Sequence, residues 1–399
     1  MTLRNAFRSG VATLAIVAIV ACSGADTSEG DVRSASDERG PRYAADVAAW
    51  EAFAGAMVAK GDRVEFETWA SDQDVYVKNP CAPGDSPGTG GCAVPQWPDA
   101  NAPKRLTTSL LSQVHMGMNK AATTTPLDPT VGCTTPSGGY PEGPAAGFPA
   151  DACVGEEVRR DRKSFDYIVA RNLFSKAGLK VAYGGDAVSF PNDTVQLKAD
   201  WIAVSALAQW IGKTEDYVRE HFYISRATVD GTETDVAMTS MHVSIKTADH
   251  PDWIWANFEN ADIPGRCDQT GCNDSFGLQG GSTPVNSSPW QAYGTCARTE
   301  DLDALLKASG IAAVFGNYCL TGTQLAYNDP DLLGSPVIEG LLANVAADNS
   351  SCISCHRGAS FDSEGAAETK FFSGPVIGNT TVPEGGKAYD FMWGVLFAN

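Results

Sequence analysis

Two cysteines and a histidine in the C-terminal part of the chain have the spacing of a cofactor attachment site. They are Cys352, Cys355 and His356, in the order Cys-x-x-Cys-His. This order is typical of c-type haem, whose porphyrin is held by thioether bonds to two cysteines. The histidine that follows the second cysteine can bind the haem iron through its imidazole. The motif therefore predicts one covalent haem c, with His356 as the proximal ligand of the haem iron.

Two other kinds of site use a pair of cysteines at this spacing. A thiol redox motif would follow a strand at the start of a β-α-β unit, and the sequence before Cys352 does not have that pattern. A zinc site would need a second pair of ligands at similar spacing, and none follows Cys355. We therefore expect haem rather than either alternative.

A second protein ligand can bind the other face of the iron. The first candidate is His242, which lies in an alternating strand pattern where it shares a face with Ser244 and Lys246. The second is Met392, in the aromatic segment that ends the chain. An ordinary role in the core is the alternative for both. Weaker candidates for the iron are His115, Met116 and Met118. Lys246 and Arg357 could pair with haem propionates or be surface charges.

The elements that would position the motif are a helix before it and a short tail after it. Residues 337–347 have an apolar face at helical spacing and run into the motif. Only 43 residues follow His356, ending in the aromatic segment 389–397. This is short for a self-sufficient cytochrome domain. We therefore expect the preceding part of the chain to cover part of the haem.

The preceding part shows both strand and helix patterns. Strand patterns occur at residues 63–69, 194–204, 222–229, 236–245 and 253–258, and helix patterns at 44–60, 106–118, 164–176 and 300–309. Helices do not alternate regularly with strands, which argues against a doubly wound sheet. We predict an α+β fold with a mixed or antiparallel sheet and loop disulfides, followed by a short helical, cytochrome c-like haem segment.

The first 21 residues have the pattern of an export signal. Two arginines precede an apolar stretch and small residues, and Ile19-Val20-Ala21-Cys22 resembles a lipobox, in which the cysteine is lipidated. An ordinary secretory signal is the alternative. Ser23 after the cysteine resembles lipoproteins of the outer membrane. We expect a signal peptide at 1–21, a flexible tether at 22–43, the body at 44–334 and the haem segment at 335–399.

Charge and cysteine content agree with export. The formal net charge is −19 and becomes −21 without the first 21 residues, which disfavours nucleic acid as a partner and suits a basic redox protein. Of the 11 cysteines, eight remain after Cys22, Cys352 and Cys355 are set aside. An even number in an exported chain predicts disulfides. Pairing by sequence neighbour gives 81–92, 133–153, 267–272 and 296–319.

Short patterns spread over residues 46–399 accompany the haem motif. They are Trp50-x-x-Phe53, Glu67-Thr68-Trp69, Leu197-Lys198-Ala199-x-Trp201, Met241-His242-Val243-x-x-Lys246-Thr247, Trp253-Ile254-Trp255-x-x-Phe258-Glu259, Gly322-Thr323-Gln324, Val337-Ile338-Glu339 and Asp390-Phe391-x-Trp393. With these patterns the chain resembles a group of large bacterial exported proteins that carry one C-terminal c-type haem, the cytochrome c family. The resemblance implies a haem protein and gives no substrate.

The predicted function is electron transfer at the periplasmic face of a membrane. One covalent haem and a lipid anchor fit one-electron exchange with a redox partner. Two alternatives stay open: a periplasmic haem enzyme, such as a peroxidase or an oxidase of a small molecule, and a lipoprotein whose haem binds a gas or another ligand. The length of the body favours an enzyme, whereas the single attachment motif differs from the two motifs of dihaem peroxidases. The coordination number of the iron would discriminate between these functions.

Overall fold

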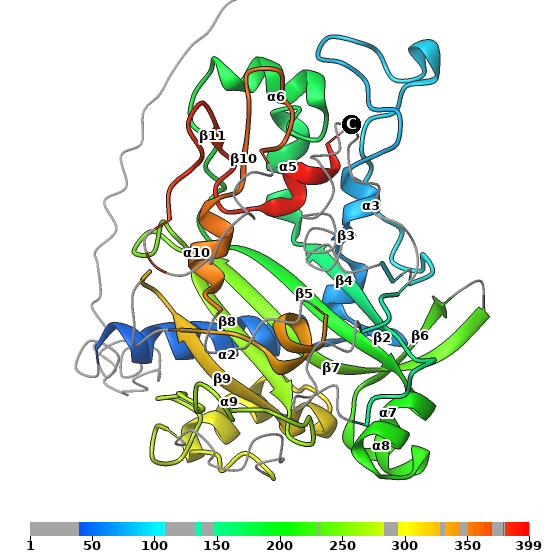
Figure 1. Ribbon diagram of the computed structural model, residues 1–399, viewed down its shortest axis with the longest axis vertical. Helices are drawn as coiled ribbons and strands as arrows, with labels where there is room; N and C mark the ends of the chain where they lie inside the picture. The colour runs from blue at the N-terminus through cyan, green and yellow to red at the C-terminus, as the bar shows by residue number, and fades with distance from the viewer. Residues whose placement is uncertain are drawn as a thin grey trace, which may run out of the picture.

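The fold is α+β and is built around one large antiparallel sheet (Figure 1). The computed structural model describes residues 40–104, 106–107, 133–136, 147–229, 232–282, 294–327, 332–342, 350–368, 378 and 380–398. The predicted signal peptide and Cys22, together with most of the predicted tether, lie outside these residues. No helix in the described ranges combines the length and the apolar character that a membrane span requires.

The large sheet has seven strands, and every neighbouring pair is antiparallel. Its order is β3 (Ala70–Ser71), β4 (Val154–Arg160), β5 (Thr194–Ala203), β7 (Thr232–Lys246), β8 (Ile254–Asn260) and β9 (Tyr318–Gln324), with β6 (Ile224–Val229) also paired to β7. Two small sheets pair β1 (Ala59–Lys60) with β2 (Arg63–Val64) and β10 (Ser360–Phe361) with β11 (Lys387–Ala388). The predicted antiparallel α+β arrangement is therefore confirmed.

Helices cover the sheet and its ends, as Figure 1 shows. They are α2 (Pro41–Ala56), α3 (Asp72–Val75), α5 (Arg162–Ala170), α6 (Lys176–Tyr183), α7 (Val204–Ile211), α8 (Glu215–His221), α9 (Glu300–Ser309) and α10 (Cys352–Arg357). The shorter turns are η1 (Glu65–Thr68), η2 (Thr89–Gly91), η3 (Ala313–Asn317), the π-helical η4 (Pro336–Leu342) and η7 (Trp393–Phe397). Most of the α-helices begin at a residue of a type that can cap them. For example, the Thr299 side chain accepts a hydrogen bond from Leu302 N at the start of α9.

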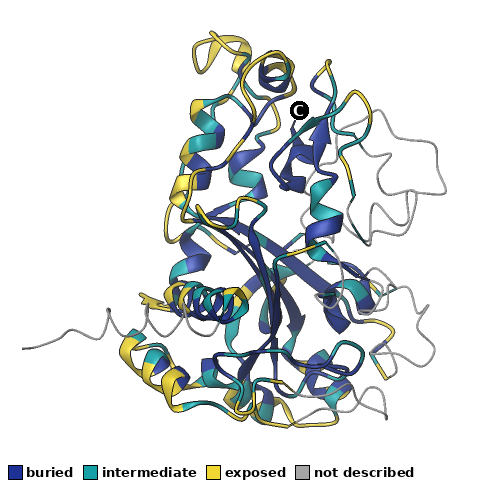
Figure 2. Cartoon of the chain, turned by 90° about the vertical axis from the view of Figure 1, so that its left-hand side faces the viewer, coloured by how far each residue is buried: buried dark blue, intermediate teal, exposed yellow. Residues whose placement is uncertain are grey.

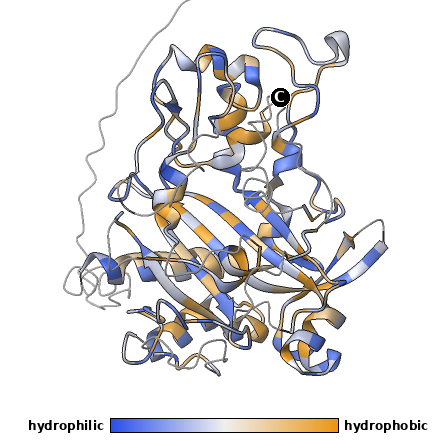
Figure 3. Ribbon diagram, in the orientation of Figure 1, coloured by the Kyte–Doolittle hydropathy of each residue, from blue (hydrophilic) through white to orange (hydrophobic). Residues whose placement is uncertain are grey.

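One face of the large sheet is apolar and packs against α2. Strand alternation places the side chains of Met241, Val243 and Ile245 of β7 on this face, where they are buried. Phe53 of α2 stacks on Phe258 of β8 with ring centroids 4.4 Å apart. Each large apolar side chain that is fully buried contributes roughly 1.5–3 kcal/mol to stability. The buried strands in Figure 2 and the alternating hydropathy along them in Figure 3 show this core.

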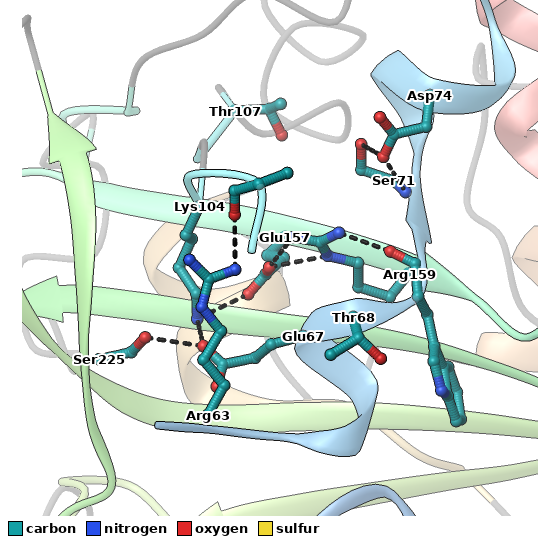
Figure 4. A network of polar contacts seen from close by, with 12 residues as sticks. Arg63, Glu67, Thr68, Ser71, Asp74, Lys104, Thr107, Glu157, Arg159 and Ser225 are labelled. Carbon is teal, nitrogen blue, oxygen red and sulfur yellow. Dashed lines mark hydrogen bonds and ion pairs between the residues drawn. The ribbon is translucent and has the colours of Figure 1, made fainter. Parts of the chain in front are cut away.

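The predicted strand at residues 63–69 is wrong. Only Arg63–Val64 is extended, and Glu65–Thr68 forms η1. The chain turns because the Glu67 carboxylate accepts a hydrogen bond from Val64 N at 3.1 Å and is drawn into a buried charge network (Figure 4). In this network Lys104 contacts both Glu67 and Glu157, the latter at 3.1 Å. The buried ion pair, rather than the local alternation of residue types, therefore determines the structure of this segment.

Another expected element is divided in the structure. The predicted helix at 164–176 is split between α5, which ends at Ala170, and α6, which begins at Lys176. Asn172 between them has a positive φ of 54°, which a continuous helix does not allow. The strands at 194–204, 222–229, 236–245 and 253–258 and the helix at 300–309 lie within a few residues of their predicted positions. The predicted helix at 106–118 lies almost entirely outside the described residues.

All four predicted disulfide pairs are found. They join Cys81 to Cys92, Cys133 to Cys153, Cys267 to Cys272 and Cys296 to Cys319, with Cα–Cα distances of 4.8, 5.5, 4.9 and 5.8 Å. These distances lie in the usual range for a disulfide. The first three bridges close loops between the main elements, and Cys296–Cys319 joins the segment before α9 to β9. Cys352 and Cys355 are free thiols.

The described residues after 350 pack on the body through a shared apolar cluster. Ile353, Phe361 and Tyr389 lie in the same cluster as Phe165 of α5 and Trp253 near β8. A buried hydrogen bond joins the Tyr389 hydroxyl to the carbonyl of Leu173 at 3.1 Å. Figure 1 shows α10, β10 and β11 beside α5 and α6, at one end of the large sheet.

Candidate functional site

The helix α10 carries the Cys-x-x-Cys-His motif and is held in place by a strand of the large sheet. Its first turn is capped by Ser351, whose hydroxyl accepts a hydrogen bond from Ser354 N at 3.3 Å. The fully buried Gln324 of β9 donates to the Ser351 hydroxyl at 2.9 Å and accepts from Ile353 N at 3.0 Å. One amide side chain thus fixes both the cap and Ile353, one of the two residues between the cysteines.

The two motif cysteines have the properties of unreactive, protonated thiols. Burial raises the pKa of Cys355 to about 12, and the neighbouring Glu339 raises it further. Burial also raises the pKa of Cys352 well above its ordinary value, again with a contribution from Glu339. Redox-active cysteine pairs need the opposite, a lowered thiol pKa. Burial, through its effect on the pKa of both thiols, therefore disfavours a thiol redox site at this motif.

The imidazole of His356 is oriented by the carbonyl of Phe391. Its Nδ1 lies 2.7 Å from that oxygen. Because a carbonyl can only accept, Nδ1 carries the proton and Nε2 keeps its free lone pair. Burial lowers the pKa of His356 to about 4, so the ring is neutral at pH 7. Histidines that bind metals usually have this arrangement, with one nitrogen donating to a backbone carbonyl and the other facing the metal.

The Phe391 carbonyl is held by a strained turn in the tail. Asp390 and Phe391 have positive φ angles of 48° and 70°, which are uncommon for residues other than glycine. The Asp390 carboxylate is anchored by Lys246 of β7, whose Nζ lies 2.7 and 2.6 Å from its two oxygens, and it accepts from Phe190 N at 2.6 Å. A buried ion pair with the large sheet therefore fixes the turn that orients His356.

The face of the large sheet opposite α2 carries buried polar residues next to this motif. The pairing of β5, β7 and β8 places Lys198, His242 and Asn257 in one row across the sheet. The adjacent row contains Asp200, Ser240 and Glu259, and Glu156 of β4 pairs with Asp200. We call these seven residues the polar face: Glu156, Lys198, Asp200, Ser240, His242, Asn257 and Glu259. Glu339 of the π-helical η4 approaches it, with an oxygen 3.8 Å from Nε2 of His242.

The polar face is accessible where it meets the Cys-x-x-Cys-His motif. The side chains of His242, Glu339 and Lys198 are 13%, 15% and 23% exposed. The motif residues Cys352, Cys355 and His356 are also half-buried, whereas Asp200, Asn257 and Glu259 are fully buried. Solvent therefore reaches the polar face beside α10.

The structure brings His242, the first candidate for the second iron ligand, close to His356. Burial lowers the pKa of His242 well below its ordinary value, and the positive charge of Lys198 lowers it further. Its ring is therefore neutral at pH 7. Its Nε2 is buried and has no hydrogen-bond partner among the residues that the structure describes.

The other candidates are placed differently. Met392 is 4% exposed and packs in the apolar cluster of the tail, directly after the residue that orients His356. Lys246 forms a buried ion pair with Asp390. Arg357 lies 4.0 Å from Asp252 and over the ring of Phe391 at 5.3 Å, with a side chain that is 38% exposed. His115, Met116 and Met118 lie outside the described residues.

Sequence reasoning missed three contributors to this site. Lys198 and Glu339 occur at positions in the sequence where surface residues also occur, and Gln324 resembles any polar residue of a strand. The only sequence signal for these three residues is the short patterns that contain them, and those patterns do not show what the residues contact. Their roles depend on contacts between parts of the chain that are far apart in sequence.

Comparison with protein families, with curated proteins and with solved structures found no match to this chain.

Proposed function

We propose that the protein is an exported c-type haem protein that transfers electrons. The observation that carries the proposal is the 2.7 Å contact between His356 Nδ1 and the Phe391 carbonyl, on a helix whose two cysteines are free. This contact leaves Nε2 of His356 available as an iron ligand. The Cys-x-x-Cys-His motif and the resemblance to the cytochrome c family support the same assignment.

The residues of this region fit a haem in several respects. Cys352 and Cys355 would hold the porphyrin through thioether bonds, and His356 would bind the iron from the proximal side. Once bound, the haem supplies one-electron redox chemistry. His242 is our first choice for the distal ligand, because its unpartnered nitrogen lies close to His356. Met392 is the second choice.

A haem needs fewer protein ligands than a bare metal ion. No group of three or more His, Cys, Asp or Glu side chains is arranged for a metal in the described part of the chain. A porphyrin supplies four nitrogens itself, so one or two histidines are sufficient. The two histidines of this site therefore fit haem iron better than a zinc ion held by protein ligands alone.

Attachment of haem can be tested directly. The chain is expressed with its signal in a host that attaches c-type haem, and the purified protein is extracted with acidified acetone. The colour should stay on the polypeptide, and the double variant Cys352→Ala/Cys355→Ala should lose it. The control Cys81→Ser/Cys92→Ser removes two cysteines from a loop disulfide and should keep the haem. Colourless wild-type protein from a competent host refutes the proposal.

The buried polar face favours a second candidate function, a haem enzyme that acts on a small polar molecule. An electron carrier needs no buried charged residues next to its haem motif, yet Lys198 and Glu339 lie beside the motif with His242 and remain partly accessible. Optical spectra of the oxidised and reduced protein separate the two functions. Six-coordinate low-spin iron supports electron transfer, whereas a five-coordinate or water-bound iron supports an enzyme or a ligand-binding haem.

A further inference from the structure

The indole of Trp255 on β8 lies against the imidazole of His356. The centroids of the two rings are 4.4 Å apart, and their planes are inclined by 45°. Aromatic rings at such a distance are in direct contact. Trp255 is only 3% exposed, so its side chain keeps water away from this side of the imidazole. The indole therefore limits how far the imidazole of His356 can rotate.

The indole has a fixed position because the turn before β8 holds it. Trp255 Nε1 donates a hydrogen bond to the carbonyl oxygen of Asp252 at 3.0 Å. The Asp252 carboxylate accepts a hydrogen bond from the Tyr327 hydroxyl at 3.2 Å, and its other oxygen lies 4.0 Å from Arg357. Burial and the hydrogen bond together restrict the side chain of Trp255 to one conformation. The indole is therefore a rigid support for the imidazole.

The neighbouring strand contributes the residue that holds the other end of α10. Trp255 of β8 pairs with Gln324 of β9, so their side chains leave the same face of the sheet side by side. Gln324 contacts Ser351 and Ile353 at the start of α10. Trp255 contacts His356 near the end of the same helix. Two adjacent positions of the large sheet therefore hold both ends of the helix that carries the motif.

We propose that Trp255 is a positioning residue for the haem iron and acts through His356, by holding the imidazole in one rotation and by keeping water from it. The Phe391 carbonyl fixes Nδ1 of His356 from the tail, whereas Trp255 restrains the ring from β8, so the two contacts come from separate parts of the chain. The inference rests on the proposed haem function and deepens it.

Exclusion of water by Trp255 has a direct consequence for the reduction potential. Oxidised haem carries one more positive charge than reduced haem, and water stabilises that charge. A dry environment around an axial ligand therefore favours the reduced state and raises the potential. Trp255 should thus contribute to the potential of the haem without contacting the iron.

The test compares Trp255→Leu and Trp255→Phe in the haem-loaded full chain. Leucine removes the planar contact with His356 and leaves space for water, so the reduction potential should fall. The electron paramagnetic resonance spectrum of the oxidised protein should also change, because its g values depend on the orientation of the axial imidazole. Phenylalanine keeps an aromatic ring against His356 and should recover most of both changes, although it cannot donate to the Asp252 carbonyl. Covalent haem content should match wild type in both variants.

A matched control separates positioning from loss of stability. Trp50→Leu makes the same change in α2, where the indole is also buried and donates a hydrogen bond to Asp274 at 2.8 Å. This variant should lose a comparable free energy of unfolding, measured with urea, and keep the wild-type potential and spectrum. Tyr327→Phe removes only the hydroxyl that holds Asp252 and should lower the potential by less than Trp255→Leu.

Three outcomes overturn the inference. They are an unchanged potential and spectrum in Trp255→Leu, an equal shift in Trp50→Leu, and no recovery in Trp255→Phe. If Trp255→Leu does not fold, unchanged potentials in both Trp255→Phe and Tyr327→Phe overturn it instead. Absence of covalent haem from the wild-type protein contradicts the proposed function, and acid–acetone extraction detects that failure separately.

Discussion

His242 and Met392 come from different parts of the fold, and this separates them as iron ligands. His242 lies on the polar face, where its Nε2 accepts no hydrogen bond from any described residue, whereas Met392 packs among apolar side chains of the tail. We expect His242→Ala to convert six-coordinate low-spin iron to a five-coordinate or water-bound form. Met392→Ala should leave the spectrum unchanged. Optical spectra of the oxidised proteins, including the red region where methionine ligation gives a weak band, make the measurement.

The result also has consequences for redox potential. Bis-histidine ligation usually gives a lower potential than histidine–methionine ligation. A low-spin spectrum that survives in both single variants would remove both residues as candidates. His356→Ala serves as the reference, since loss of the proximal ligand should destabilise haem binding while the disulfide-bonded body remains folded.

Asp274 is a second residue whose environment has a measurable effect. Burial and the neighbouring Asp46 raise the pKa of Asp274 from 3.8 to about 7, although it accepts hydrogen bonds from Gly277 N at 2.7 Å and Trp50 Nε1 at 2.8 Å. The unfolded chain has the ordinary value near 3.9. Between about pH 4 and pH 7 the folded state therefore binds more protons than the unfolded state. Its stability falls as the pH rises through this window.

This pH dependence can be measured by urea unfolding at pH 5 and pH 8. Asp274 should make the wild-type protein less stable at pH 8 than at pH 5. Asp274→Asn should reduce this difference in the free energy of unfolding between the two pH values. Glu259, whose pKa burial also raises to about 7, acts in the same direction and leaves a residual slope. The control Asp166→Asn changes a carboxylate that is 55% exposed and should keep the wild-type slope. A steeper slope in Asp274→Asn would contradict the assignment.

At the scale of elements, the turn at Asp390–Phe391 links β7 to the Cys-x-x-Cys-His motif. Asp390→Asn leaves Lys246 buried without its partner, which typically costs about 3–5 kcal/mol. With the anchor lost, the strained turn should relax and the hydrogen bond from His356 Nδ1 to Phe391 should weaken. A weaker hydrogen bond makes the imidazole a poorer electron donor, so the reduction potential should rise. Potentiometric titration of the haem-loaded variant gives the answer.

A matched control separates positioning from stability. Asp72→Asn breaks another buried ion pair, with Arg160 at 2.6 Å, and should lose similar stability while keeping the potential. If both variants shift the potential equally, the turn has no specific role in orienting His356. Asp390→Glu keeps the charge and should recover part of the wild-type potential.

The elements differ in how far the sequence could predict them. The alternation in β5 and β7 placed these strands within a few residues, because buried apolar side chains repeat every second position. The disulfides could be predicted because each joins two cysteines that follow one another in the sequence, even where α9 lies between them, as for Cys296 and Cys319. The turn of η1 could not, because it depends on the contact of Glu67 with Lys104, far along the chain.

The candidate site divides in the same way. The motif at Cys352–His356 is local and was found from spacing alone, and His242 was chosen from its position on a strand. The polar face was not predicted as a unit. Lys198 and Asp200 alternate with apolar residues, which is also the pattern of a strand exposed to water. That face is covered in part by η4, which lies more than a hundred residues later in the chain and contacts β7.

At the scale of the whole molecule, the body and the motif depend on each other. Gln324 of β9 holds the first turn of α10, and Lys246 of β7 holds the turn that orients His356. The segment after residue 350 also shares an apolar cluster with α5 and α6. The long body therefore acts as the support of the site, which a small electron carrier would not need.

The proposed placement of this molecule in the cell rests on its first residues. The stretch Ile19–Cys22 predicts lipidation of Cys22, and helix α2 begins at Pro41. The intervening chain can span at most ~3.3–3.6 Å per residue, roughly 60 Å in all, so an anchored body could meet a soluble redox partner close to the membrane. Export also agrees with the four disulfides, which form in oxidising compartments.

Lipid anchoring at Cys22 is tested by fractionating cells that express the full chain. Cys22→Ala should leave the membrane fraction, either as soluble periplasmic protein or as uncleaved precursor, because the acyl chains that hold it have no attachment point. Ser23→Asp keeps the cysteine and should stay with membranes, moving from the outer to the inner membrane if the residue after the lipidated cysteine directs sorting. If Cys22→Ala fractionates with membranes as wild type does, another contact holds the protein there. That result would contradict lipid anchoring and indicate that a membrane partner recruits the protein.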